Sequence, residues 1–173
     1  MKNNNTFKIC ITAVFIALVY IATALIQIPI PLGYANLGDS IILLASFLFT
    51  PWIACIAGGV GASMADVLTG YPIWAVPTLI IKVGIALIAC SIFSIGKKNK
   101  SLYSVRTIAG AVISMLFMAA GYTVFGAILY GSVAAGLSST PGLLAEGVIN
   151  IIVFYVIGTI LDKAGIRKLI AGI

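Results

Sequence analysis

The sequence predicts an all-α integral membrane protein in which six transmembrane helices form one compact bundle, a single domain over residues 1–173. Hydrophobic residues make up 62% of the chain and charged residues only 8%, whereas soluble domains carry about 25% charged residues. The apolar runs approach the ~20 residues that a helix needs to cross the hydrocarbon core. Basic residues gather in short clusters between these runs, as they do beside membrane helices.

The expected helices follow one another with short connections. The run from 37 to 70 is too long for one span, because at 1.5 Å per residue it would measure roughly 50 Å against ~30 Å of hydrocarbon. Pro51, in the stretch FTPW, predicts two shorter helices joined by a tight turn. The six helices are expected at about 7–28, 37–50, 52–70, 74–95, 105–131 and 141–161.

The distribution of basic residues predicts the orientation in the membrane. With six helices, the amino-terminal end, the KKNK loop and the carboxy-terminal tail fall on one side, which then holds nine of the ten basic residues; the tenth is Lys82. The connections near 29–36, 70–77 and 131–140 contain no Lys or Arg. The positive-inside rule therefore predicts that both termini are cytoplasmic. With five helices, the amino terminus and the KKNK loop would lie on opposite faces.

Several classes of protein are disfavoured. The basic clusters lie between apolar runs, which argues against nucleic-acid binding. Cys10, Cys55 and Cys90 are scattered and the sequence has no histidine, so we expect no metal site and interpret the cysteines as small apolar side chains. No GxxxxGK[ST], HExxH or GxSxG motif occurs, so we assign no catalytic residue and expect no ATPase activity in this chain. An intramembrane aspartyl pair, Asp39 with Asp66, is the enzyme alternative.

Four ionisable residues remain inside the expected spans, and the predicted topology places each within about 10 Å of the outer end of its helix. Charges at membrane depth normally face a bundle interior or a water-filled cavity and pair there. Lys82 is therefore expected to face inward, with Asp66 or Asp39 as its partner. The alternatives are a structural ion pair near the headgroups and, for Asp39, a helix cap. The four residues are Asp39, Asp66, Lys82 and Glu146.

The last helix and the outer loops supply further candidates. Glu146 and Asn150 are four residues apart and share one helix face, where they offer acceptors and donors to a polar heterocycle; the alternative is an interhelical hydrogen bond. Tyr34, Tyr71 and Trp74 lie in Pro/Gly-rich outer loops, where their rings either stack on an aromatic ligand or anchor the protein at the interface. Three acids and one lysine give a formal charge of −2, which favours a neutral or cationic ligand.

The first expected helix contains Ala13 and Ala17, small residues four apart. Such a pair lets another helix approach closely. On spacing alone, packing inside the bundle explains it better than an external partner.

Three motifs between residues 28 and 82 carry a resemblance to a known family. They read GYxNLGD, GGxGxxxAD and GYPxWxxxTLIIK. With the six short helices, this half of the chain resembles the substrate-binding S component of energy-coupling factor (ECF) vitamin transporters. It is most similar to the group that serves hydroxymethylpyrimidine, pyridoxine or riboflavin. The second half matches in length, topology and its polar last helix, but not motif by motif.

The resemblance implies a function and partners. An S component captures a vitamin or its precursor outside the plasma membrane of a prokaryote, and then associates with a membrane scaffold subunit and two cytosolic ATPase subunits, toppling to release the ligand inside. The chain itself would need no cofactor, because ATP is used by the partner subunits. In the family, the small-residue motif of the first helix meets the scaffold, which carries over to Ala13 and Ala17.

We therefore expect a multi-pass capture subunit for a small polar aromatic compound. Hydroxymethylpyrimidine, pyridoxine or a thiamin-like compound is preferred, because of the acidic balance and Glu146, and riboflavin is the alternative. A structural or assembly subunit without a ligand is the rival from another class. The predicted substrate-binding residues are Tyr34, Asn36, Asp39, Asp66, Tyr71, Trp74, Lys82, Glu146 and Asn150.

Overall fold

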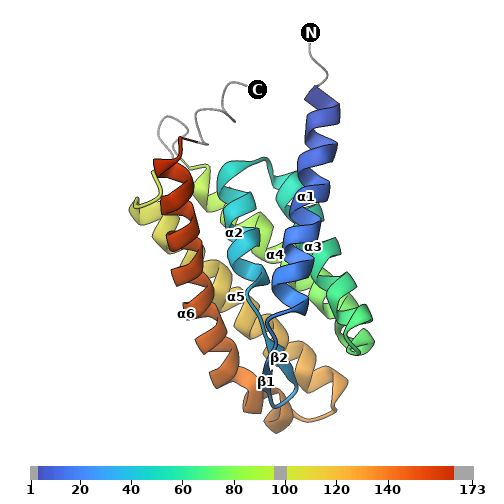
Figure 1. Ribbon diagram of the computed structural model, residues 1–173. Coiled ribbons are helices and arrows are strands. Elements are labelled where there is room, and N and C mark those ends of the chain that lie inside the picture. Colours follow the sequence, from blue (N-terminus) through green and yellow to red (C-terminus); the bar gives the residue numbers. More distant parts are fainter. Residues whose placement is uncertain (1–3, 96–100, 166–173) are drawn as a thin grey trace.

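The structure, a computed structural model, describes residues 4–95 and 101–165 and is all-helical apart from one short hairpin (Figure 1). This confirms the predicted fold class at the level of an all-α bundle. Every predicted helix is present, with ends that differ from the prediction by up to a few residues except at the last helix. The helices are α1 (Asn4–Ala24), α2 (Gly38–Leu48), α3 (Pro51–Leu68), α4 (Ala75–Phe93), α5 (Val105–Leu129) and α6 (Val133–Lys163).

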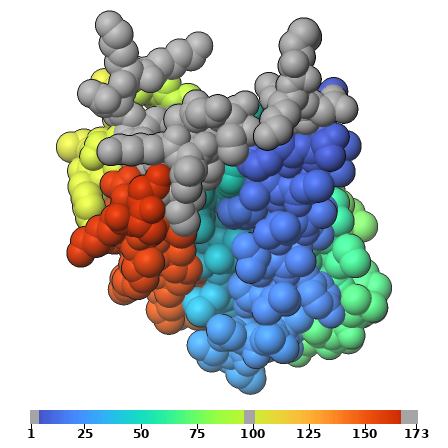
Figure 2. All heavy atoms as spheres, turned by 45° about the horizontal axis from the view of Figure 1, so that its top comes forward, coloured from blue at the N-terminus to red at the C-terminus, as the bar shows by residue number. Residues whose placement is uncertain are grey.

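The short helix α2 forms the centre of the bundle. It contacts α1, α3, α4 and α6, and the longer helices pack in the order α1, α3, α4, α5, α6 around it. Figure 2 shows α2 recessed between α1 and α6. Nine of its residues are buried, which explains why its apolar residues are not confined to one stripe.

Five helices are long and apolar enough to cross a membrane, and α2 is the exception. With 11 residues, α2 is roughly 16 Å long, about half the hydrocarbon thickness. The beginning of α1 and the end of α6 lie at the same end of the bundle, and the hairpin lies at the other end (Figure 1). The break at Pro51 is confirmed, because Pro51 begins α3.

The outer connection predicted at 29–36 contains a β-hairpin that the sequence reading missed. Strand β1 (Ile28–Ile30) pairs antiparallel with β2 (Gly33–Ala35), with Ile28 opposite Ala35. The same feature ends α1 at Ala24 rather than at 28. Prolines at 29 and 31 cannot donate the backbone bonds of a helix, and each pushes the residue before it toward extended backbone.

The start of the last helix was predicted wrongly. Helix α6 begins at Val133, not at 141, and Pro141 lies inside it. The helix was predicted to begin at Pro141, but Ser132 is the residue that caps it, with its hydroxyl oxygen accepting a bond from the Ala135 N–H at 3.4 Å. The segment 133–140 was predicted to belong to the outer connection near 131–140; in the structure it adds two turns to α6.

Small residues bring the helices close together around α2. A Cβ atom on Gly61 would lie 2.7 Å from the carbonyl oxygen of Ile16 on α1, and one on Gly58 would lie 2.9 Å from Ile42 of α2. The small residues of the third helix therefore serve packing inside the bundle, as expected for such spacing.

Candidate functional site

A pocket lies at the hairpin end of the bundle, between the hairpin and the helices α3 to α6. About 40 Å³ inside it is open to the centres of water molecules, which is room for a few waters and makes the pocket narrow. Six of the nine predicted binding residues line it. The lining comprises Ile30, Leu32, Gly33, Tyr34, Asn36, Asp66, Tyr71, Trp74, Thr78, Tyr122, Ser139, Leu143 and Glu146.

Lys82 lies behind this lining and pairs with Asp39. Its Nζ is 2.7 Å from Asp39 Oδ1, and both side chains have no exposed surface. Of the two partners expected for Lys82, the structure therefore selects Asp39. The ammonium group also lies 5.3 Å from the ring centroid of Tyr122. A charge buried this deeply needs such neighbours, because an unpaired one costs several kcal/mol.

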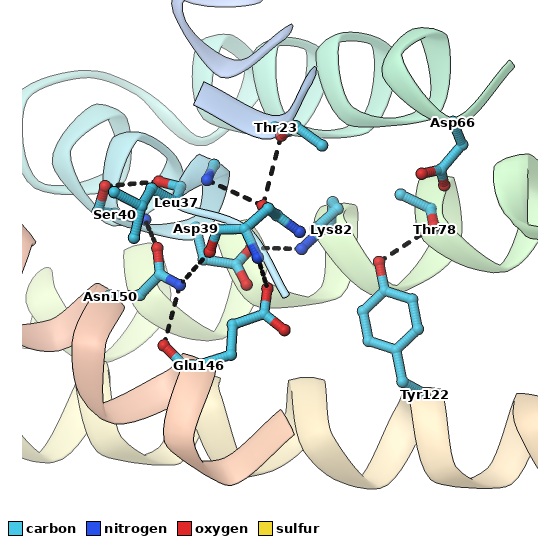
Figure 3. Close-up of polar contacts among 12 residues, drawn as sticks. Thr23, Leu37, Asp39, Ser40, Asp66, Thr78, Lys82, Tyr122, Glu146 and Asn150 are labelled. Carbon is cyan, nitrogen blue, oxygen red and sulfur yellow. Dashed lines mark hydrogen bonds and ion pairs between the residues drawn. The ribbon is translucent and has the colours of Figure 1, made fainter. Parts of the chain in front are cut away.

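Asp39 does not cap α2 through its side chain. The cap position of α2 is Leu37, which makes no side-chain cap bond, and Asp39 lies in the first turn. Figure 3 shows its carboxylate directed toward Lys82. Neither Asp39 nor Lys82 is part of the pocket wall, so contact of these two side chains with a ligand stays a prediction that the geometry does not favour.

Asp66, at the end of α3, lines the pocket and is held by the hairpin. The Tyr34 hydroxyl donates to Asp66 Oδ1 at 2.5 Å. Burial and this bond to the carboxylate raise the pKa of the Tyr34 phenol above its ordinary value, so it remains a donor at neutral pH. Oδ2 of Asp66 is buried and has no partner among the described residues.

Glu146, from α6, lines the pocket and is likewise held by the segment after the hairpin. Its Oε1 accepts the backbone N–H of Asn36 at 3.1 Å, and its other oxygen makes no hydrogen bond within the described part of the chain. Each acid of the wall thus has one oxygen committed to residues 34–36 and one left over. A carboxylate has about four acceptor sites, so each retains capacity for a ligand.

Asn150 is used by the protein itself. Its Oδ1 accepts the N–H of Ser40 at 2.7 Å, and its Nδ2 donates to the carbonyl oxygens of Asn36 at 2.8 Å and Glu146 at 3.0 Å (Figure 3). The side chain is fully buried behind the wall. Its shared helix face with Glu146 was correctly predicted, but its carboxamide joins α6 to the start of α2, and a role in binding stays a prediction.

Asn36 connects the pocket to α1. Its side-chain oxygen accepts the N–H of Gly38 at 2.9 Å and lies 3.5 Å from the hydroxyl of Thr23 on α1. A Cβ on Gly38 would lie 2.2 Å from that hydroxyl. This corner has no room for a larger residue than glycine, which gives the GYxNLGD motif a physical reason.

Aromatic rings surround the pocket. Tyr34 and Tyr71 meet edge to face with centroids 4.9 Å apart, and Trp74 packs 5.7 Å from Tyr122. Trp74 belongs to a single 3₁₀ turn, η1 (Pro72–Trp74), that leads into α4. The Tyr122 hydroxyl donates to Thr78 at 3.0 Å. These rings offer faces and edges on which a flat ligand can pack.

The predicted common depth needs correction at Glu146. Because α6 begins at Val133, Glu146 is 13 residues from the start of its helix, or roughly 20 Å rather than 10 Å. It still lines the same pocket as Asp66, because the first turns of α6 lie alongside the hairpin (Figure 1).

The sequence reading missed several lining residues. Thr78, Tyr122, Ser139 and Leu143 face the pocket. Ser139 accepts the N–H of Leu32 at 3.0 Å and so fastens the hairpin turn to α6. Tyr122 lies in an apolar span with no polar residue at helical spacing, so only its hydroxyl group set it apart from the other residues of the span. Ser139 lies in the segment that was predicted to be a connection.

The predicted partner residues Ala13 and Ala17 are exposed on α1. Val14, 52% exposed, and Leu18, 41% exposed, extend the same apolar surface. Figure 2 shows α1 along one side of the molecule, next to α3. The pair therefore does not pack inside the bundle.

The fold and the pocket together define a class: an integral membrane protein with an internal, partly acidic pocket at one end of its bundle. Residues 3–163 match the family model of the ECF-type riboflavin transporter S component. The chain belongs to this family. It is a vitamin-transport subunit by family and not itself an enzyme.

Two relatives align with most of the chain. The chain is 38% identical over 147 residues to a Pyrococcus woesei protein described as an uncharacterized protein in gap 3'region, covering 84% of this chain and 95% of the relative. It is 28% identical over 171 residues to the thiamine precursor transporter HmpT of Lactococcus lactis subsp. cremoris (strain MG1363), covering 96% and 94%.

A solved structure shares the fold. It is described as the S component of a bacterial ECF transporter, and it superposes with a TM-score of 0.74 at 21% identity, covering 91% of this chain and 96% of that one. This likeness shows that the two chains share their overall fold.

Proposed function

We propose that this protein is the substrate-capture subunit of an ECF-type importer and binds a small polar aromatic vitamin or precursor in the pocket beneath the hairpin. In this proposal all six helices belong to the membrane domain, both termini are cytoplasmic, and the hairpin end faces outward. The absence of Lys and Arg from the three outer connections supports this orientation.

The charge of the pocket wall supports a neutral or cationic ligand. Asp66 and Glu146 line it, and none of the described lining residues is basic. Lys82 does not offset them, because its charge is matched by Asp39 behind the wall. A protonatable pyrimidine or pyridine, such as hydroxymethylpyrimidine, pyridoxine or a thiamin-like compound, therefore fits better than an anion.

The size of the pocket favours a single ring. A pocket with room for a few waters must open less to admit a single pyrimidine ring than to admit a three-ring flavin. The similarity to a thiamine precursor transporter supports the same choice. Riboflavin remains the second candidate, because the family model carries its name and the aromatic wall also suits a larger ring system.

Delivery is proposed to depend on partners. A membrane scaffold and two cytosolic ATPase subunits would supply the energy, so that this chain needs no cofactor and ATP is used by the partners. The exposed pair Ala13 and Ala17 on α1 is the proposed contact with the scaffold.

The observation that carries the proposal is the acid-lined pocket with carboxylate oxygens left unused. The test is titration calorimetry of the purified protein against a panel of vitamins and precursors, with mass spectrometry of compounds that co-purify. Saturable binding of one ring compound and a ligand-dependent rise in melting temperature are expected. A structural subunit without a ligand predicts neither, and binding of riboflavin alone selects the second candidate.

The partner contact has its own test. Replacing Ala13 and Ala17 by leucine is expected to abolish uptake in cells that hold the whole transporter, while the purified variant binds ligand normally. Ala120→Leu, at an exposed position of α5, is the matched control and should transport normally. Normal uptake by the double variant would exclude α1 as the contact.

A further inference from the structure

Two polar atoms of the pocket wall have no partner among the described residues. They are Oδ2 of Asp66 and Nε1 of Trp74, an acceptor and a donor. Asp66 is 5% exposed and Trp74 is 6% exposed, so bulk water does not satisfy them. Leaving a buried polar group unpaired lowers stability, and such groups in a binding pocket indicate what a ligand must supply.

The two side chains both line the pocket, and backbone hydrogen bonds connect the segments that carry them. The Tyr71 N–H donates to the Asp66 carbonyl oxygen at 2.8 Å, and the Trp74 N–H donates to the Tyr71 carbonyl oxygen at 2.9 Å. This short turn attaches η1 to the end of α3. Tyr34 fixes the Asp66 carboxylate, and the Trp74 ring packs against Tyr122 and Tyr130, so both side chains are restrained by their neighbours.

We propose that Asp66 and Trp74 form a specificity site for an aromatic nitrogen heterocycle that carries an amino group next to a ring nitrogen. The amino group donates to Asp66 Oδ2, and the neighbouring ring nitrogen accepts from Trp74 Nε1. This inference rests on the proposed function and narrows the ligand to an amino-substituted ring. Asp66 and Trp74 bind the edge of the ring that carries the amino group, while Glu146 faces another part of the ring.

An alternative ligand for the same two atoms is a ring that carries a carbonyl group next to a ring N–H. It also pairs an acceptor with a donor, but in the orientation of the amino ligand it presents them in the reverse order, and such rings are neutral near pH 7. The amino-substituted ring is basic, and the wall holds two acids and no basic residue among those described. Charge and hydrogen bonding therefore agree only for the amino form.

The experiment uses a matched pair of ligands. One is 2-methyl-5-hydroxymethylpyrimidine with an amino group at position 4, and the other has a 4-oxo group in its place. Affinities are measured by calorimetry on the purified full chain and on the variants Asp66→Asn and Trp74→Phe. The controls are Asp162→Asn and Trp52→Phe, because Asp162 and Trp52 are exposed and lie toward the end of the bundle opposite the hairpin.

The wild-type protein is expected to prefer the amino ligand by roughly tenfold or more, as a buried site does when the wrong ligand leaves its groups unpaired. Asp66→Asn should lower this preference about fivefold or more, because the amide accepts more weakly and can reverse its donor and acceptor. Trp74→Phe should weaken binding of the amino ligand about fivefold and keep the ring packing. Both control variants should match the wild type.

Each contrary outcome has a distinct meaning. If the wild type binds neither pyrimidine and no other ring compound, the proposed function is wrong and this inference falls with it. If the wild type binds both ligands equally, or prefers the oxo form, only the inference is overturned. The same holds if Asp66→Asn weakens both ligands alike, since that is the signature of a merely structural carboxylate held by Tyr34.

Discussion

Asp39 and Asp66 are two buried aspartates near the hairpin end that the structure uses in opposite ways. Asp39 lies behind the pocket wall with one oxygen 2.7 Å from the Lys82 ammonium. Asp66 lies on the wall with one oxygen bonded to a neutral tyrosine hydroxyl. Each has a second oxygen without a partner among the described residues, so unsatisfied capacity alone does not distinguish them.

The difference between them is the neighbouring charge and the access to the pocket. The Asp39–Lys82 pair is neutral as a unit and serves the contact between α2 and α4. Asp66 has no cation in hydrogen-bonding contact within the described residues, and its carboxylate faces a space that a ligand can enter. A buried acid in a membrane bundle therefore serves either helix packing or ligand binding. The groups that contact its carboxylate show which of the two roles it has.

The largest expected effect is on the buried pair. Lys82→Met leaves Asp39 buried and unpaired, so the free energy of unfolding should fall by about 3–5 kcal/mol, measured by chemical denaturation in detergent. Adding Asp39→Leu should restore most of this loss, because the apolar pair removes the uncompensated charge. A single variant as stable as the wild type would show that the pair does not hold α2 to α4.

Asn150→Ala is expected to be the next most severe change. It removes three hydrogen bonds to backbone groups, two of which belong to residues 36 and 40, at roughly 1 kcal/mol each. The free energy of unfolding should fall by about 3 kcal/mol in the same assay. Ser138→Ala, at an exposed position of α6, should change it by less than about 0.5 kcal/mol. If Asn150→Ala leaves the free energy of unfolding unchanged, the carboxamide does not stabilise the fold and is available to bind the ligand.

Glu146→Gln tests the other side of the comparison. The change keeps an acceptor for the Asn36 N–H but removes the charge, so affinity for a protonatable ligand should weaken by about 1–3 kcal/mol while stability changes little. Calorimetry and denaturation on the same preparation separate the two quantities, with Asp162→Asn as control. Unchanged affinity would remove Glu146 from the site.

The smallest effect is expected at the ring of Tyr122. Thr78→Val keeps the shape but removes the acceptor of the Tyr122 hydroxyl, which should weaken ligand binding by about 1 kcal/mol. Thr12→Val is the control, because Thr12 bonds only within its own helix, to the Lys8 carbonyl oxygen. If both variants bind ligand as the wild type does, Tyr122 needs no support from Thr78 to keep its place.

Much of the helical framework was predictable, because hydrophobic length and proline breaks act locally. Pro51 correctly separated α2 from α3. Pro141 lies inside α6 rather than at its start, because proline is tolerated inside a membrane helix when neighbouring groups compensate. The hairpin was missed for another reason: its stability depends on contacts such as that of Leu32 with Ser139, 107 residues apart.

The sequence predicted which residues belong to the candidate site, but not which side chains would bind to one another. Charged and polar side chains are so costly in lipid that their mere presence in the spans indicated an interior location, and Asp66, Glu146 and Trp74 do line the pocket. No feature of the neighbouring sequence indicated that Lys82 would form its ion pair with Asp39. Nor did any indicate that the Asn150 side chain would hydrogen-bond to backbone groups of residues 36 and 40.

Amino-acid composition and the pattern of charges were sufficient to establish a helical membrane bundle and to select its inward-facing residues, because transfer into lipid penalises each residue separately. The tertiary structure alone determines which aspartate pairs with Lys82 and which is left to bind a ligand. It does so because α2 packs at the centre of the other helices. That choice depends on distances of a few ångströms between segments far apart in the chain, and a linear sequence does not contain them.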